Sequence, residues 1–256
     1  MRLPALSGVI RRRILVNFRV QPEVMQRLLP APFEPKLVGG SAMAGVCLIR
    51  LEQVRPRFLP PSLGFHSENA AHRVAVCWQD ESGELREGVY VPRRDTDSLC
   101  TSLAGGRLFP GEQQHARFTV RDEDGVIDFA MESADGEVAI RLRGRTGLGM
   151  PAGSRFASVD EASAFFQAGS VGYSATRGGD RLDGMCLCTA VWQIEPLMLE
   201  SIDSSFFADE AKFPPGSIEL DSAFLMRNIP HEWQSVPDLQ TAAPVGAEAD
   251  GPLAVP

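Results

Sequence analysis

Two arginines and a glutamate in the segment 88–116 have the types and spacing of a small-molecule binding site. The segment reads GVYVPRRDTDSLCTSLAGGRLFPGEQQHA, in which Arg93 and Arg94 closely follow the apolar stretch 88–91. A guanidinium group can hold a carboxylate through two parallel hydrogen bonds, and a strand end would position it rigidly. Glu112 follows the next turn, where a partly buried carboxyl group could act as a general acid or base. The alternative is a surface crossover whose charged side chains are solvated.

Other patterns that carry well-known chemistry are absent from the sequence. It has no serine nucleophile elbow, no phosphate-binding loop, no HExxH motif and no paired CxxC motif. The four histidines are scattered, and only proximity in the chain links Cys100 to His115 as a thiol nucleophile and its base. Asp95 and Asp97 could bind a divalent cation, but their place before a helical turn favours a capping role. We therefore predict neither a metal site nor a cofactor.

The composition predicts a globular protein without affinity for nucleic acid or membranes. The chain has 256 residues, of which 44% are hydrophobic and 23% charged, and its net charge is -8. A negative chain has no general attraction to nucleic acid or to anionic membranes. No apolar run approaches the roughly 20 residues of a membrane span, and the N-terminus lacks signal-peptide features. The five cysteines are irregularly spaced, as expected of reduced thiols in a cytoplasmic protein.

Short strands separated by turns dominate the pattern. The dipeptides at 124–125 and 135–136 are Asp-Gly, a strong hairpin signal, and they predict a meander of strands 115–121, 126–133 and 137–143. Further strands are predicted from β-branched and alternating segments at 14–20, 41–54, 72–79, 85–91, 169–176, 181–195 and 217–226. Many short strands with few helices favour a single antiparallel-rich domain that is closed or nearly closed as a barrel.

Helices and irregular segments are expected to be few. Pro22 opens one short helix, and Ser158 caps another that runs to Phe166. Residues 197–207 are predicted to be partly helical, and a helical turn is expected after Asp95. The segment 57–71 is predicted to be a loop. We expect one domain over residues 1–236 and a disordered tail over 237–256.

Three stretches resemble acetoacetate decarboxylase. They are the lead-in RRRILVNFR at 11–19, the loop LGFHSE at 63–68 and the turn FPGE at 109–112. The whole chain to about Trp233 also resembles a large bacterial family grouped as domain of unknown function 2071, through GVYVPRRDT, AGGRLFPG, GSVGYS and RNIPHEW. The resemblance implies an acetoacetate-decarboxylase-like β-barrel, mainly β and mostly antiparallel, with a few short peripheral helices. It also raises the possibility of a homo-oligomer, since related enzymes assemble.

The resemblance assigns roles to some residues and leaves the catalytic amine unmatched. Arg11 matches the arginine that holds the substrate carboxylate, and Glu68 matches the active-site glutamate. The catalytic lysine has no match, because Gly111 or Glu112 stands in its place. Schiff-base decarboxylation needs an unprotonated amine, which arginine cannot supply.

The two lysines of the chain lie far from the matching turn in sequence. Lys36 follows FEP, and Lys212 precedes FPP. We therefore expect a pocket that lacks a Schiff-base lysine.

The sequence thus predicts an interior pocket for a small, anionic ligand with a carboxylate or carbonyl group. Arg11, Arg93 and Arg94 are the candidate binding residues, and Glu68 and Glu112 are the candidate acid/base residues. If the protein is an enzyme, carboxylate acid/base chemistry of the lyase or hydrolase type is expected. The alternative is a non-catalytic small-molecule-binding or interaction module whose charged groups form ion pairs at the barrel mouth.

Overall fold

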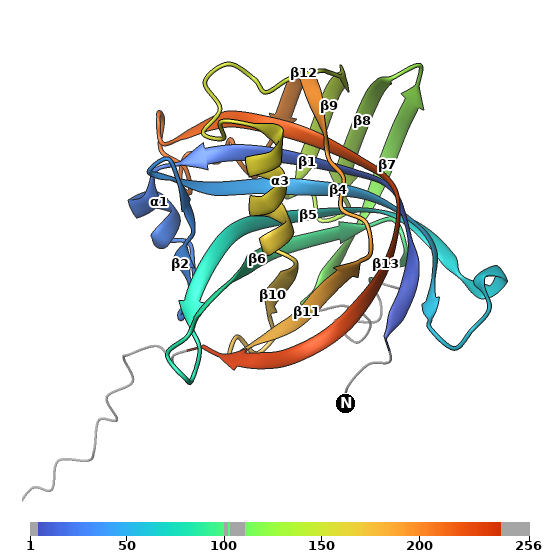
Figure 1. Ribbon diagram of the computed structural model, residues 1–256, viewed down its shortest axis with the longest axis horizontal. Helices are drawn as coiled ribbons and strands as arrows, with labels where there is room; N and C mark the ends of the chain where they lie inside the picture. The colour runs from blue at the N-terminus through green and yellow to red at the C-terminus, as the bar shows by residue number, and fades with distance from the viewer. Residues whose placement is uncertain (1–4, 100–101, 103–110, 242–256) are drawn as a thin grey trace, which may run out of the picture.

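A computed structural model describes residues 5–99, 102 and 111–241 of the chain (Figure 1). Its elements are β1 (Leu6–Val20), α1 (Pro22–Gln26), β2 (Glu34–Pro35), β3 (Leu37–Val38), β4 (Ser41–Pro56), the 3-10 helix η1 (Pro61–Leu63), β5 (Phe65–Gln79), β6 (Leu85–Thr96), β7 (Gln113–Glu123), β8 (Val126–Ser133), β9 (Ala139–Thr146), α3 (Val159–Ala168), β10 (Val171–Ala175), β11 (Arg181–Thr189), β12 (Glu195–Ser204) and β13 (Ile218–Gln240). None of the described helices is long and apolar enough to cross a membrane.

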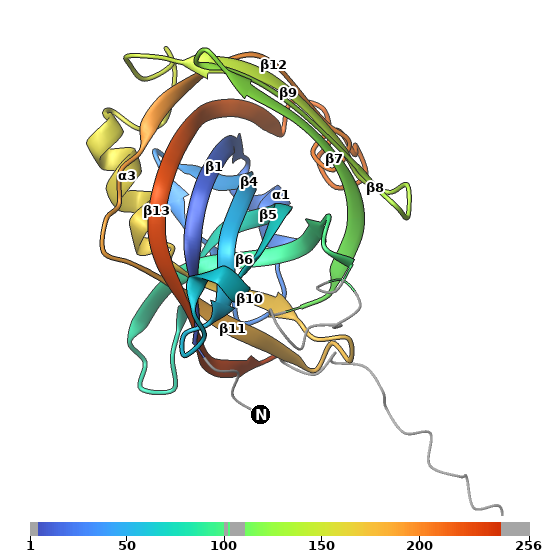
Figure 2. The ribbon, with the colours of Figure 1, turned by 90° about the vertical axis from the view of Figure 1, so that its right-hand side faces the viewer.

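The strands form one mixed sheet that closes into a ring (Figure 2). The order of the sheet is β11-β10-β6-β7-β8-β9-β12-β13-β1-β4-β5-β2, and the additional pairings β11–β13 and β5–β6 close it. The pairs β6–β7 and β6–β10 are parallel, while the other pairs among the described strands are antiparallel. This confirms the prediction of a mainly β, mostly antiparallel fold with few helices.

The meander predicted from the two Asp-Gly turns is confirmed as β7, β8 and β9. Glu123 pairs with Val126 across the first turn. Asp124 and Gly125 have φ angles of 52° and 77° there, the left-handed conformation that such tight turns require. Glycine and aspartate tolerate this conformation best, which is why the dipeptide located the turn in the sequence.

Two apolar cores lie on opposite faces of the central strands. Because side chains alternate along a strand, Ile14 and Val16 of β1 face the inside of the ring, and Leu15 faces outward. The outer face packs under α3, whose Ala162 and Phe166 belong to the second core; Figure 1 shows this helix lying across β1, β4 and β5. The Ser158 side chain accepts a hydrogen bond from the Glu161 backbone N–H, as the sequence predicted for the start of this helix.

Several strands are longer than the sequence indicated, because neighbouring strands extend their hydrogen-bonded ladders. Strand β6 continues through Arg93 and Arg94 to Thr96, paired with β5, so the two arginines lie within a strand. The predicted loop 57–71 is wrong from Phe65 onward, and Glu68 lies in β5 opposite Arg50.

The prediction of partial helix at 197–207 is also wrong, because residues 195–204 form β12 and pair with β9. Strand β13 runs to Gln240 against β11, so residues 237–240 are strand and not part of the tail. Residues 242–256 of the predicted tail and most of the helical turn expected after Asp95 lie outside the described residues.

Candidate functional site

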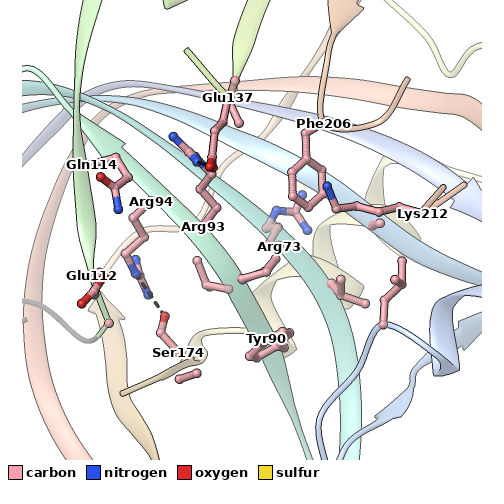
Figure 3. Close-up of a pocket in the computed structure, with 18 of the residues that line it drawn as sticks. Arg73, Tyr90, Arg93, Arg94, Glu112, Gln114, Glu137, Ser174, Phe206 and Lys212 are labelled. Atoms are coloured by element: carbon pink, nitrogen blue, oxygen red, sulfur yellow. Dashed lines mark hydrogen bonds and ion pairs between the residues drawn. The ribbon is translucent and has the colours of Figure 1, made fainter. Parts of the chain in front are cut away.

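A cavity of about 590 Å³ opens on the inner face of the ring (Figure 3). This volume is typical of a small-molecule site. Met25, Leu28, Ala44 and Val74 give the cavity an apolar floor. Its polar lining is formed by Arg73, Tyr90, Arg93, Arg94, Glu112, Gln114, Glu137, Ser174, Thr176, Arg177, Ser205, Asp209 and Lys212. The lining therefore joins an apolar surface to a limited set of charged groups, the usual design of a ligand pocket.

Arg94 presents a guanidinium group without a carboxylate partner among the described residues. Its Nε donates a hydrogen bond to Ser174 Oγ at 3.2 Å, drawn in Figure 3, and no described carboxylate lies within ion-pair distance. Burial lowers the pKa of Arg94 to about 10, so the side chain remains a cation at neutral pH. Arg94 is thus a positive charge in the wall of the cavity that is available to an anionic ligand.

Arg93, the next residue of β6, is surrounded by carboxylates. Its guanidinium lies 2.9 Å from Asp95, 2.8 Å from Asp135 and 2.7 Å from Glu137. Although burial favours the neutral form, the hydrogen bonds and charges of Asp95 and Asp135 raise the pKa of Arg93. Arg93 therefore lines the cavity as part of an ion-pair network, with its charge already balanced.

Glu112 lies on the cavity wall but is also paired. Its carboxylate accepts a hydrogen bond from Arg177 Nε, and its side chain is 40% exposed. The neighbouring Gly111 has a φ of 71°, and a Cβ atom added there would lie 2.5 Å from Ser174 Cβ. The turn that resembles the lysine-bearing turn therefore has no room for a lysine at Gly111 in this conformation.

We expected neither lysine to reach the pocket, and for Lys212 this expectation is wrong. The turn between β12 and β13 carries Lys212 into the lining, where its Nζ lies 2.7 Å from Asp209 and 5.1 Å from the ring centroid of Phe206. The hydrogen bond from Lys212 lowers the pKa of Asp209, so the two groups form an ion pair. Lys36 lies elsewhere, paired with Glu87 at 2.6 Å.

Glu68 belongs to a different buried network. It accepts a hydrogen bond of 2.7 Å from Arg12, and Arg50 lies 3.9 Å away. Burial raises the pKa of Glu68 even though both arginines oppose that change. Asp122 lies 4.0 Å from Arg12, which extends the network to β7. Glu68 is not among the residues that line the main cavity.

Arg11 points away from Glu68 and from the main cavity. It is exposed, and its Nη1 donates a hydrogen bond to Asn228 Oδ1 at 2.6 Å. Arg12, the next residue, is buried and donates a hydrogen bond to Glu68. Of the five candidate residues, the structure brings together Arg93, Arg94 and Glu112 and separates them from Arg11 and Glu68.

Sequence reasoning missed Arg73, Ser174, Phe206 and Lys212. Arg73 interrupts the apolar strand HRVAVCWQ, and a charge in such a strand is a signal of a buried polar site. Ser174 and Phe206 carry no comparable signal, because a serine or phenylalanine in a strand or turn is most often structural. Within the described residues, no group of three or more His, Cys, Asp or Glu side chains has the arrangement of a metal site.

Comparison with solved structures shows that the fold is that of acetoacetate decarboxylase, as the resemblance implied. The acetoacetate decarboxylase of Legionella pneumophila subsp. pneumophila str. Philadelphia 1 matches with a TM-score of 0.57 and 14% identity, over 93% of this chain and 89% of that chain. An acetoacetate decarboxylase-like enzyme from Sphingomonas wittichii RW1 matches with a TM-score of 0.59 and 16% identity, over 93% and 94% of the two chains. The enduracididine biosynthesis enzyme MppR complexed with pyruvate matches with a TM-score of 0.55 and 13% identity, over 93% and 91%.

No curated protein matches the sequence. The model of the family DUF2071, described as an uncharacterized conserved protein, matches residues 9–225 and so covers most of the barrel. The chain therefore belongs to the DUF2071 family.

Proposed function

We propose that the main cavity binds a small organic molecule with a carboxylate or a carbonyl group, and that Arg94 is its principal anchor. The observation that carries this proposal is the guanidinium of Arg94, which has Ser174 but no described carboxylate as a partner. A desolvated arginine favours a bidentate carboxylate, and the Ser174 hydrogen bond fixes the orientation of that fork. MppR, a protein of the same fold, has been observed with pyruvate, a small carboxylate that carries a carbonyl group.

The remaining lining supports an organic ligand of limited size. Tyr90 and Phe206 supply aromatic surface, and Leu28 and Val74 supply aliphatic surface. Lys212 contributes a further cation that could donate a hydrogen bond to a carbonyl oxygen. Its Nζ is engaged by Asp209 at 2.7 Å, and the proposal includes no Schiff base.

Two observations bear on whether the ligand is only bound or also converted. The carboxylates of Glu112, Glu137 and Asp209 are each held in an ion pair, which supports binding without turnover. The second candidate is acid/base catalysis of the lyase or hydrolase type by Glu112. It is supported by the place of Glu112 on the same cavity wall as Arg94, and it requires the ligand to displace Arg177.

The test is a thermal-shift titration with pyruvate, acetoacetate and the neutral ketone acetone. We expect the two keto acids to raise the melting temperature in a saturable way and acetone to have a much smaller effect. The Arg94→Gln variant should bind the keto acids roughly 10- to 100-fold more weakly, because a charged hydrogen-bond donor is lost. Arg11→Gln, which removes an exposed arginine away from the cavity, is the matched control.

Proton NMR of the same mixtures distinguishes binding without turnover from catalysis. Keto-acid binding without any change of the ligand spectrum supports the binder, and product formation that Glu112→Gln abolishes supports the second candidate. If neither keto acid binds, or if Arg94→Gln binds as tightly as the unaltered protein, the proposal is wrong.

A further inference from the structure

A second and smaller cavity lies behind the main one, on the face of the sheet that the second core covers. Its volume is about 110 Å³. We call it the rear chamber, defined by the polar residues Arg13, Cys47, Arg73, Arg94 and Trp192 in its lining. Arg73 and Arg94 also line the main cavity, so they form part of the wall between the two spaces. Arg13 and Trp192 line the rear chamber but not the main cavity.

Several buried hydrogen-bond donors in this chamber have no partner among the described residues. Within the part of the chain that the structure describes, Arg13 donates one weak hydrogen bond, from Nη2 to Cys47 Sγ at 3.5 Å, while its Nε and Nη1 are buried without an acceptor. Trp192 Nε1 is buried and unpartnered in the same way, and the Arg13 guanidinium lies 5.5 Å from the Trp192 ring centroid. Buried donors are nearly always satisfied in native proteins, so three unused donors around one cavity point to a missing acceptor.

The charges of the chamber are unbalanced as well. No described carboxylate lies within ion-pair distance of Arg13, Arg73 or Arg94, which bond instead to neutral groups and to Cys47. Arg73 Nε lies 3.1 Å from Cys47 Sγ. Burial raises the pKa of the Cys47 thiol, but the charges and hydrogen bonds of Arg13 and Arg73 outweigh it, and the net pKa is lowered. Even a thiolate at Cys47 leaves three guanidinium groups facing one negative charge, a costly excess in a protein interior.

We propose that the rear chamber is a binding site for a small oxyanion, a carboxylate or a phosphate-sized group. Arg13 and Trp192 would donate hydrogen bonds to its oxygens, and Arg73 and Arg94 would contribute charge. A water molecule needs about 10 to 15 Å³ of such space, so the chamber has room for an anion of several heavy atoms. The inference goes beyond the proposed function, because its specific donors belong to a different cavity.

The experiment measures binding of acetate and of inorganic phosphate to the full chain by isothermal titration at constant ionic strength. We expect saturable binding of at least one of the two anions. Arg13→Gln should weaken it roughly 10- to 100-fold, because a charged donor facing the anion is lost. Trp192→Phe keeps the aromatic surface, removes one donor and should weaken binding about threefold to tenfold. Arg11→Gln, which removes an exposed arginine that does not line the rear chamber, is the matched control and should bind as the unaltered protein does.

A pyruvate titration of the same variants tests the rear chamber independently of the ligand binding proposed for the main cavity. Pyruvate carries a carboxylate and also suits the rear chamber, so phosphate is the discriminating probe. Because Arg13 and Trp192 do not line the main cavity, Arg13→Gln and Trp192→Phe should lose phosphate affinity and keep the pyruvate binding of the main cavity. If anion binding is not saturable, or is equal in the unaltered protein and both variants, the rear chamber is not an anion site. If Arg13→Gln does not fold, Trp192→Phe decides the question alone. Failure of pyruvate to bind at all would remove the proposed function and leave this result standing.

Crystals grown with selenate locate the site directly. The anomalous signal of selenium should appear in the rear chamber, with selenate oxygens within hydrogen-bonding distance of Arg13 and Trp192. A signal confined to the main cavity, or no signal at saturating selenate, would overturn the assignment.

Discussion

The Nε atom of Arg94 lies 3.2 Å from Ser174 Oγ, and this hydrogen bond joins β6 to β10 across the wall of the main cavity. A neutral hydroxyl orients the guanidinium without neutralising its charge. Arg93, the preceding residue, has three carboxylates around it. Two adjacent arginines of one strand therefore have different roles, since one is a structural ion pair and the other is available to a ligand.

The first prediction follows from this contrast and concerns stability. Asp95 is fully buried and Arg93 is 11% exposed, so Arg93→Gln leaves a buried carboxylate without its cation. We expect the free energy of unfolding to fall by about 3 kcal/mol, as is usual when one partner of a buried pair is removed. Urea denaturation measures this free energy of unfolding. Arg94→Gln is the control, and its free energy of unfolding should fall much less, because no described carboxylate is paired with Arg94. Equal decreases in the two variants would contradict the assignment of Arg93 as the structural ion pair.

Ser174→Ala should weaken keto-acid binding about threefold to tenfold, because it removes the one neutral hydrogen bond that holds the Arg94 guanidinium in place. The charge itself remains, so the loss should be smaller than that of Arg94→Gln. Thermal-shift titration with pyruvate measures both variants. Ser102→Ala, which removes a serine hydroxyl bonded to Leu99 O, is the control substitution. An effect of Ser174→Ala as large as that of Arg94→Gln would mean that the hydroxyl contacts the ligand itself.

Glu68→Gln should leave keto-acid affinity unchanged, in contrast to the role that the resemblance gives to Glu68. Its carboxylate accepts a hydrogen bond from Arg12 and does not line the main cavity. The same thermal-shift titration tests this, with Glu112→Gln as the comparison on the cavity wall. Loss of affinity in Glu68→Gln, without a matching loss in the unfolding free energy, would place Glu68 at the ligand.

The sequence predicted the fold better than it predicted the site, for physical reasons. The Asp-Gly turns at 124–125 and 135–136 and the Ser158 cap are local signals, and they located the meander and α3 correctly. The extensions of β6 and β13 depend on pairing with β5 and β11, which are distant in the chain, so no local pattern could reveal them.

Site residues depend on strand register even more strongly. A shift of one residue exchanges the two faces of a strand, and the sequence alone does not show that Arg12 is buried against Glu68 while Arg11 is exposed. The presence of Lys212 in the cavity depends on the position of the turn between β12 and β13 in space. Arg93 and Arg94 were predicted because they closely follow an apolar stretch, but only the structure shows which of the two has no carboxylate partner among the described residues.

The last prediction concerns pH and the buried His72. Its two ring nitrogens have no hydrogen-bond partner among the described residues, and its ring centroid lies 4.3 Å from that of Phe206. Burial, reinforced by the charges of Arg93 and Lys212, lowers the pKa of His72 to about 3. The folded state therefore stays unprotonated at this site while the unfolded chain takes up a proton near pH 6.5, so stability present above pH 6.5 is lost as the pH falls toward 3. At pH 5 the loss from this residue amounts to about 2 kcal/mol.

His72→Phe should remove that part of the pH dependence. Between pH 7.5 and pH 5, urea denaturation should therefore show an unfolding free energy that falls by about 2 kcal/mol less in His72→Phe than in the unaltered protein. His66→Gln, which replaces an exposed histidine, should follow the unaltered protein; parallel curves for His72→Phe as well would show that His72 takes up its proton in the folded state.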